Sequence, residues 1–450
     1  MIRAFVLFLI LVLLSVGVAW LADHPGHVTV FWLGYRIDTS FAVLAGAAAV
    51  LSVISGLLWR GWGAVKGVVR RTSAARQERR RHRGYRALTR GFVAVAAGDR
   101  DEARRQAERA DVLLADPPLT LLLSAQAAQL SGDEQAAQKY FTSMLDRPDT
   151  AFLGLRGLLN AALRDHDRQQ ALMLARRAYQ LRPKTAWLVT VLAELQSQAG
   201  QWAEAAIVLH RARRSGILAE GKRDEAVALA GQSEAADSEG HEAESIELLR
   251  RAYKLSPYFV PVAARLAARL AARGDKRRAR KIIEAAWAQE PHPDLAKAFI
   301  SIVPGEEPLA RLQRTARLAK LRPDHAESHI AIAEAALDAE LWGEARRHLR
   351  LALLAPNPGR RIFRLMAKLE EEENDDPVAV RQWLARAAEA DPDPAWVCRR
   401  CTNTAPLWRP LCPSCEAFDA LAWSSPAHPA LAAPVAASVP APLSSPAGSA

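Results

Sequence analysis

The sequence lacks the residue groupings that most enzymes need. Cysteine is scarce: the chain of 450 residues has four, and all of them lie in one short segment. No Ser-His-Asp arrangement, phosphate-binding loop or pair of carboxylates stands out, and no strand, G-x-G-x-x-G turn and helix open the chain. The nearest approach, Gly61 to Gly67, has the wrong spacing for a dinucleotide. These absences argue against an enzyme.

Positive charge is concentrated rather than spread. The net charge is +11, yet eleven Lys or Arg lie between Arg60 and Arg90 with Glu78 as their one acidic neighbour, and the remaining charges balance to within one. Aromatic residues that could stack on bases are nearly absent there, so we expect no nucleic-acid partner. Such a cluster is typical of the cytoplasmic side of a membrane, where it contacts anionic lipid.

Two uncharged apolar runs precede this cluster, at residues 4–22 and 41–59. At about 1.5 Å per residue each would span roughly 28 Å, close to a bilayer core. The first run is long for a signal peptide, and no small-x-small cleavage site precedes Asp23. We therefore predict a membrane anchor of two spans over residues 1–63, contacting lipid through both runs and the Arg cluster, with both termini in the cytoplasm.

The loop between the spans, residues 23–40, is poor in Lys and Arg and is expected to face outward. Residues 27–37 alternate in a way that predicts a small hairpin, with Trp32 and Tyr35 at headgroup level. His24 and His27 in this loop offer a weaker case for metal or heme contact.

A two-residue marker recurs along the chain at intervals of 34, 34, 34, 40 and 34 residues. Its copies are Gly98-Asp99, Gly132-Asp133, His166-Asp167, Gly200-Gln201, Gly240-His241 and Gly274-Asp275. A small residue follows each marker five positions later, and a proline closes several units, which predicts a helix-turn-helix unit. Further units end at Pro323, Pro356 and Pro392. The 34-residue period resembles the tetratricopeptide (TPR) family, so residues 84–395 are expected to form roughly nine repeats. Before them, a helical pattern with Arg on most faces predicts an Arg-rich helix over residues 64–83.

Such repeats line a concave groove with their first helices. Arg156, Asn160 and Arg164 are spaced to share one helix face, and Trp187 and Glu194 extend that line in the next unit. They are candidates for a protein-binding groove, against the alternative of an ordinary solvated face.

Histidines are weaker candidates than these groove residues. His325 and His329 lie four residues apart without the H-E-x-x-H pattern, and an exposed polar helix start accounts for them.

Cys398, Cys401, Cys412 and Cys415 form two C-x-x-C turns separated by ten residues, a ligand set for tetrahedral zinc or, alternatively, rubredoxin-type iron. Cytoplasmic placement disfavours two disulfides. We predict a metal-folded knuckle over residues 396–423 and an uncharged, disordered tail over residues 424–450. The apolar residues of the knuckle should pack around the metal or dock the knuckle against the last repeat helix. They are Trp396, Trp408, Phe418, Leu421 and Trp423.

The layout of residues 1–395 resembles the HemY-type family of bacterial inner-membrane TPR proteins, which is associated with heme biosynthesis. The knuckle is similar to that of lipopolysaccharide assembly protein B, which has one span where two are predicted here. The resemblances imply an adaptor near the heme or porphyrin pathway, located in the inner membrane, and bring no catalytic residues. Protoporphyrinogen oxidase sometimes carries the same family label, but that flavoenzyme needs the dinucleotide turn that is missing here.

The sequence therefore predicts an all-α protein: a two-helix membrane hairpin, a TPR-like α-solenoid and a four-Cys metal knuckle. The favoured function is a scaffold that binds partner proteins. The alternatives are a regulator of lipopolysaccharide synthesis, or a heme-binding or rubredoxin-like electron carrier, although no residue pattern supports bound heme. The clients, the pathway, the metal and the oligomeric state are left open.

Overall fold

The computed structural model describes residues 2–23, 26–32, 35–114, 117–219 and 221–426. The chain divides into two compact units, residues 1–127 and 128–450, and each is described by itself. His24 and residues 427–450 of the expected tail lie outside the described residues.

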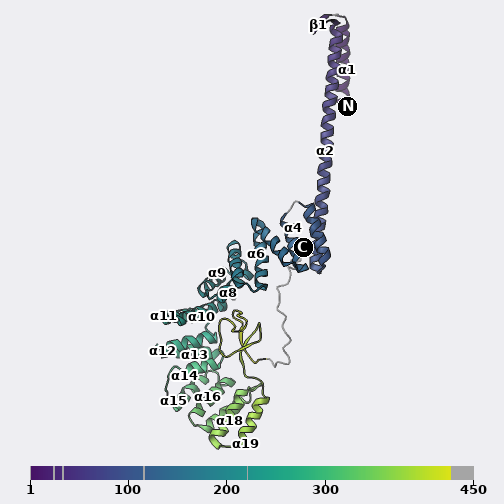
Figure 1. The fold of residues 1–450 in the computed structure, drawn as a ribbon. Helices are drawn as coiled ribbons and strands as arrows, with labels where there is room; N and C mark the ends of the chain where they lie inside the picture. The colour runs from purple at the N-terminus through teal and green to yellow at the C-terminus, as the bar shows by residue number, and fades with distance from the viewer. Residues whose placement is uncertain (1, 24–25, 33–34, 115–116, 220, 427–450) are drawn as a thin grey trace. The chain divides into compact units, whose positions relative to one another are not determined.

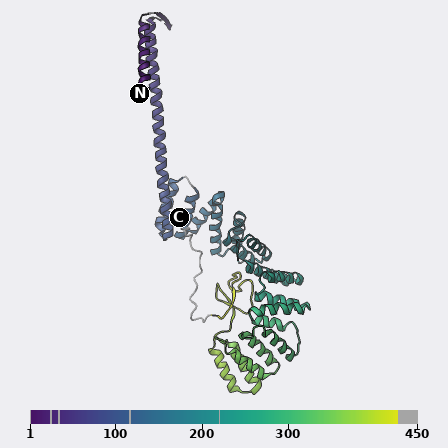
Figure 2. The ribbon, with the colours of Figure 1, turned by 180° about the vertical axis from the view of Figure 1, so that it is seen from behind.

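The first unit holds the predicted anchor. Helix α1 (Ile2–Asp23) leads into an antiparallel hairpin of β1 (His27–Trp32) and β2 (Tyr35–Ser40), with Trp32 opposite Tyr35. The predicted hairpin is thereby confirmed. Helix α2 (Phe41–Ala97) follows and pairs with α3 (Arg100–Leu113), and Figures 1 and 2 show α1 beside the first part of α2.

Among the described residues, one helix stretch is long and apolar enough to cross a membrane, Val43–Arg60, with a mean hydropathy of 1.8. It lies in the second predicted run, whereas a crossing by the first run, inside α1, stays a prediction. Helix α2 continues without a break through the Arg cluster to the first repeat, because no proline interrupts its 57 residues. Its length of about 85 Å is more than twice a bilayer core.

The recurrent marker is a helix-ending turn. Gly98, Gly132, Gly200, Gly240 and Gly274 have φ between 72° and 86°, and His166 has φ of 57°. This left-handed conformation, which glycine adopts without a steric penalty, ends the first helix of each unit. The aspartates that follow cap the second helix, since their carboxylates accept the backbone N–H three residues on: Asp99, Asp133, Asp167 and Asp275.

The remaining helices continue this alternation. They are α4 (Pro117–Ser131), α5 (Glu134–Ser143), α6 (Pro148–Arg164), α7 (Arg168–Leu181), α8 (Ala186–Gln198), α9 (Trp202–Arg214), α10 (Lys222–Ser238), α11 (Glu242–Leu255), α12 (Val260–Ala272), α13 (Lys276–Gln289), α14 (Pro293–Ile300), α15 (Pro308–Ala319), α16 (Ala326–Asp338), α17 (Trp342–Ala352), α18 (Arg360–Asn374) and α19 (Pro377–Glu389). A short 3-10 turn, Met144–Asp146, precedes α6.

Taken in sequence order, with the end of α2 as a first helix, the described residues hold nine helix pairs. The small residue five positions after each marker is at most 1% exposed in every copy; the residues are Ala103, Ala137, Ala171, Ala205, Ser245 and Ala279. A larger side chain at that position would push the two helices apart.

The cysteine segment folds as a three-stranded antiparallel sheet in the order β4-β3-β5. Its strands are β3 (Ala395–Cys398), β4 (Thr404–Ala405) and β5 (Leu421–Ser424). Within the second unit this knuckle lies on the inner side of the curve that the repeats form (Figures 1 and 2). Its buried residues Trp396, Trp408 and Leu421 belong to the same apolar core as α6 to α14.

Candidate metal centre and the groove that holds it

Two matching turns bring the thiols together. In each turn the residue after the second cysteine, Thr402 or Glu416, has positive φ and donates its N–H to the carbonyl of the first cysteine at 2.9 Å. The N–H of Arg400 also points at the sulfur of Cys398, at 3.4 Å. The C-x-x-C spacing thus makes a local loop whose backbone donors face sulfur.

The four sulfurs form a compact cluster. Cys398 Sγ lies 3.7 Å from Cys415 Sγ, Cys401 Sγ lies 3.7 Å from Cys412 Sγ, and all four are within 4.8 Å of one another. A tetrahedral ion with metal–sulfur bonds of about 2.3 Å requires sulfurs about 3.8 Å apart, whereas a disulfide requires about 2.05 Å. The cluster fits a metal ion, and its geometry does not identify which metal.

The electrostatics of the cluster favour a cation. Burial raises the pKa of the Cys398 thiol and raises that of Cys415 to about 12. Burial also acts to raise the pKa of Cys412, but the N–H groups of Cys415 and Ser414 and the neighbouring thiols outweigh it, so that the pKa is lowered to about 7. The Cys412 thiolate therefore forms readily, whereas the thiolates of Cys398 and Cys415 need a positive charge beside them, which a divalent metal would supply.

The knuckle is held at one end by ionic contacts with α7 and α8. Arg168 forms an ion pair with Glu416, and the side-chain amide of Gln198 donates to the carbonyl of Glu416 at 3.0 Å. Arg400 reaches the carboxylate of Glu194 at 3.0 Å. These contacts place the two metal-binding turns against the start of α7 and against α8, the first helix of the next unit.

A second contact uses one arginine twice. Arg223 of α10 donates to both carboxylate oxygens of Asp419, at 2.6 and 3.1 Å. The same guanidinium lies over the ring of Phe259, 4.6 Å from its centroid, and Trp408 meets that ring edge-on at 5.0 Å. The arginine is therefore fixed by charge on one side and by an aromatic ring on the other.

The third contact buries a histidine. The indole N–H of Trp396 donates to Asp294 at 3.1 Å, and the ring of His292 packs on Trp396 and Trp423 with centroids 5.4 and 4.3 Å away. His292 is 1% exposed, and burial lowers its pKa to about 4 against the opposing effect of Asp294. It is neutral at physiological pH, and its Nδ1 caps α14.

These contacts correct one sequence expectation. Docking against the last repeat helix was one of the two arrangements expected of the knuckle, yet its polar and aromatic contacts go to α7, α8, α10, Phe259 and the start of α14. The physical reason is that Glu416 and Asp419 find their arginines in those units.

The predicted groove residues divide into two groups. Arg156 lies over the ring of Trp187, 5.2 Å from its centroid, and Asn160 lies one turn further along α6. Arg164 instead pairs with Glu134 at 2.9 Å, and Glu194 is engaged by the knuckle. A clamp made of Arg156, Asn160 and Arg164 together stays a prediction.

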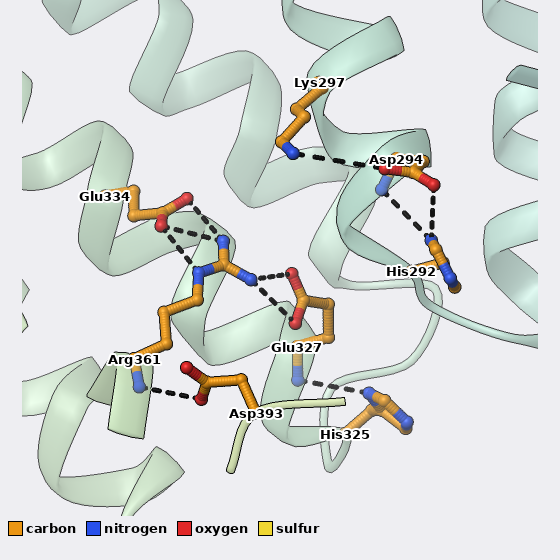
Figure 3. A network of polar contacts seen from close by, with 8 residues as sticks. All are labelled: His292, Asp294, Lys297, His325, Glu327, Glu334, Arg361 and Asp393. Atoms are coloured by element: carbon orange, nitrogen blue, oxygen red, sulfur yellow. Dashed lines mark hydrogen bonds and ion pairs between the residues drawn. The ribbon is translucent and has the colours of Figure 1, made fainter. Parts of the chain in front are cut away.

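The segment that leads into the knuckle is fixed by a polar network (Figure 3). Arg361 of α18 binds Glu334 at 2.7 Å and Glu327 at 2.9 Å, both on α16. The N–H of Arg361 donates to Asp393 at 2.7 Å, so Asp393, which follows α19 of the same helix pair, caps α18. Burial raises the pKa of Glu327, and the facing Arg361 opposes this shift.

His325, which caps the start of α16, and His329, which lies within α16, have separate partners. His325 accepts the N–H of Glu327 at 3.1 Å, as the cap of that helix (Figure 3). His329 lies with its Nδ1 3.0 Å from Nδ1 of His348 on α17. The structure does not bring His325 and His329 to one common ligand position.

Sequence reasoning missed the residues that dock the knuckle, chiefly Arg168, Arg223, Glu416 and Asp419. Their partners are separated by 248 and 196 residues, so no local pattern links them. One signal was available: Glu416 and Asp419 are the two acidic residues of the segment 396–426. A carboxylate in a small module with few acidic residues is a reasonable candidate for a docking contact.

The fold and the site together define a helical repeat protein that carries a four-thiol knuckle on the inner side of its own repeats. Residues 26–132 match the family model described as the HemY protein N-terminus, which confirms the predicted resemblance to the HemY-type family. Over 435 residues, 94% of each chain, the sequence is 29% identical to the probable magnetosome protein Mms48 of Magnetospirillum gryphiswaldense.

Solved structures that align with part of the chain include the Naa15/Naa10 complex bound to HypK-THB. It aligns with a TM-score of 0.42 and 15% identity over 68% of this chain and 50% of that one. The TPR2AB domain of yeast Sti1, solved in complex with pHSP90, aligns with a TM-score of 0.27 and 14% identity over 68% of this chain and 98% of that one.

Proposed function

We propose that the protein is a membrane-anchored adaptor that binds partner proteins at the cytoplasmic face of the bacterial inner membrane and serves heme (porphyrin) biosynthesis. The observation that carries this proposal is helix α2, in which the apolar stretch Val43–Arg60, the Arg cluster and the first repeat helix are continuous. Such a helix ties the first repeat to the bilayer without a flexible linker. The match to the HemY N-terminus supports the pathway.

The knuckle serves this adaptor as a metal-fixed part of the groove. Zinc is the metal that a closed four-thiolate site most commonly holds, and rubredoxin-type iron is the alternative. Cys398, Cys401, Cys412 and Cys415 would be its ligands, and the bound ion would supply folding energy to a module with little core of its own.

Partner proteins would use the part of the groove that the knuckle leaves free. Arg156 and Trp187 form a cation–aromatic pair on α6 and α8, next to the knuckle contact at Glu194. Together with Asn160 and Arg164 they offer donors and an aromatic surface to an extended peptide. A client would then contact the repeats and the knuckle at once.

A second setting for the same adaptor is favoured by the similarity to Mms48, which extends over 94% of both chains. In that case the protein would organise partners at a magnetosome membrane instead of serving porphyrin synthesis. The adaptor mechanism is the same, and the clients decide between the two.

Crosslinked affinity capture from native membranes, followed by mass spectrometry, tests the proposal. The intact protein is compared with Arg156→Ala/Trp187→Ala and with Arg104→Ala, whose exposed ion pair with Glu108 lies outside the groove. Porphyrin-pathway enzymes that are lost with the groove variant support the first setting, and magnetosome proteins support the second. Recovery of lipopolysaccharide enzymes would move the adaptor to envelope regulation, and the absence of any specific partner would refute the adaptor.

A further inference from the structure

A second basic cluster lies in the middle of the repeats. Residues 250–281 contain eleven Lys or Arg and one acidic residue, Asp275, which is the same imbalance as in the juxtamembrane segment. Two of these arginines face inward, where Arg265 pairs with Glu234 and Arg269 pairs with Asp237. Most of the others are exposed on α11, on α13 and in the turn before α13. The overall charge balance of the repeats hides this local excess.

These side chains surround an apolar recess. A hollow of about 250 Å³ opens between α11, α12 and α13. Its apolar lining consists of Tyr253, Leu266, Leu270 and Ile282. Its basic lining consists of Arg250, Lys254, Arg278 and Lys281. We call this feature the outer slot.

Few acidic side chains of this chain neutralise the basic residues that line the outer slot. Arg250 has Glu247 at 3.6 Å, and Arg278 has Asp275 at 3.3 Å, each a near neighbour on its own segment. Lys254 and Lys281 form no ion pair within 4.0 Å in the part of the chain that the structure describes. The positive charges that line one small hollow repel one another, and an anionic ligand would relieve that repulsion.

We infer that the outer slot binds an acidic segment of a partner protein that inserts an apolar side chain between its carboxylates. The basic lining selects carboxylates and the apolar lining selects the inserted side chain. A recess between three helices favours a protruding side chain over a flat bilayer surface, and its aliphatic lining offers little to a nucleic acid. The inference rests on the proposed adaptor function, to which it adds a second binding face.

The probe is a fluorescein-labelled 12-residue peptide of glutamates with two central leucines, and a matched peptide carries serines in place of the leucines. Binding to the full-length protein in nanodiscs is measured by anisotropy in about 50 mM salt, because electrostatic contacts weaken with ionic strength. The slot variant is Lys254→Glu/Lys281→Glu. The control variant is Lys276→Glu/Arg277→Glu, which reverses two exposed charges of α13 outside the slot.

We expect the slot variant to bind the leucine peptide at least about tenfold more weakly than the intact protein, and the control variant to stay within about twofold. The serine peptide should bind at least about fivefold more weakly than the leucine peptide. Equal binding by both variants, or equal binding of both peptides, would overturn the inference. Displacement of the leucine peptide by phosphatidylglycerol vesicles, with no leucine preference, would assign the face to lipid instead.

The test separates the two levels of the proposal. If the peptide fails to bind but affinity capture still recovers partners that depend on Arg156 and Trp187, the outer slot is refuted and the adaptor function stands. If capture recovers no specific partner, the adaptor function fails whatever the peptide does.

Discussion

Arg223 joins the knuckle to the repeats by two contacts at once. Its guanidinium is half exposed, whereas the Asp419 side chain that it binds is 9% exposed. Asp419 also has a positive φ of 45°, a conformation that non-glycine residues adopt at a cost. The arginine therefore neutralises a carboxylate that has little access to water.

Replacing Arg223 by alanine should loosen the knuckle without unfolding the repeats. The change leaves Asp419 without its cation, at a cost of roughly 1–3 kcal/mol once solvent screening at the exposed arginine is allowed for. Hydrogen exchange should rise in residues 395–424 and stay unchanged in α16 to α19. Arg104→Ala is the control, and equal protection in Arg223→Ala and the intact protein would contradict the role given to this residue.

His292 makes the docked state sensitive to pH. Its pKa in the folded protein is about 4, whereas an unfolded histidine titrates near 6.5. Between these values the unfolded chain binds a proton that the folded chain does not, so the free energy of unfolding falls as the pH is lowered from 6.5 to 4. The loss should be on the order of 2–3 kcal/mol in total.

Urea unfolding at pH 7 and at pH 5 measures this effect. His329 and His348, whose pKa values burial also lowers, contribute in the same direction, so the comparison needs a matched variant. His292→Asn keeps a side chain that can cap α14 and removes the titrating group. Its unfolding free energy should depend less on pH than that of the intact protein, and identical slopes would show that His292 plays no part.

At the scale of elements, the two C-x-x-C turns and the sheet of β3, β4 and β5 act as one module. The module shares its apolar core with the repeats, because Trp396, Trp408 and Leu421 pack in the same cluster as α6 to α14. The repeats have their own helix pairs and capped turns, which do not depend on the metal. Loss of the metal should therefore open the module and expose the groove beneath it.

The double variant Cys398→Ser/Cys401→Ser tests this dependence. Metal content by mass spectrometry should fall from about one ion per chain to none, because two of four ligands are lost. Far-ultraviolet circular dichroism should change little, while the thermal midpoint falls. Visible absorbance of the intact protein would indicate ferric tetrathiolate, and a colourless zinc-containing protein would indicate zinc. Loss of most helical signal in the variant would contradict a module that folds separately from the repeats.

At the scale of the whole molecule, the open question is how many times the chain crosses the membrane. One described stretch, Val43–Arg60, meets the length and hydropathy of a span, and α1 carries the other predicted run. Two spans would place the Arg cluster and the N-terminus on the same side, with β1 and β2 outside.

Labelling of single introduced cysteines in intact cells decides the topology. Thr29→Cys, in the hairpin, should react with a membrane-impermeant maleimide, whereas Arg104→Cys, in α3, should react only after the membrane is opened. The prediction has its physical basis in the positive-inside rule applied to the Arg cluster. Protection of Thr29→Cys in intact cells would refute the two-span arrangement.

The sequence by itself determined the features that depend on neighbouring residues. The turns of the repeats follow from a left-handed glycine and a capping aspartate one residue apart, and the thiol cluster follows from two short loops of fixed spacing. The hairpin of β1 and β2 could be predicted for the same reason. Helix α2 was predicted as separate segments: a membrane span, an Arg-rich helix and the first repeat helix. Each segment has its own composition, and no local pattern indicates that the three form one continuous helix.

Only the tertiary structure decided where the knuckle lies and which charges it uses. Glu416 and Asp419 meet Arg168 and Arg223 across 248 and 196 residues. The outer slot likewise exists only once α11, α12 and α13 are packed together. Such contacts form between surfaces that the curvature of the repeats brings together, and curvature accumulates from small rotations between units that no single unit encodes.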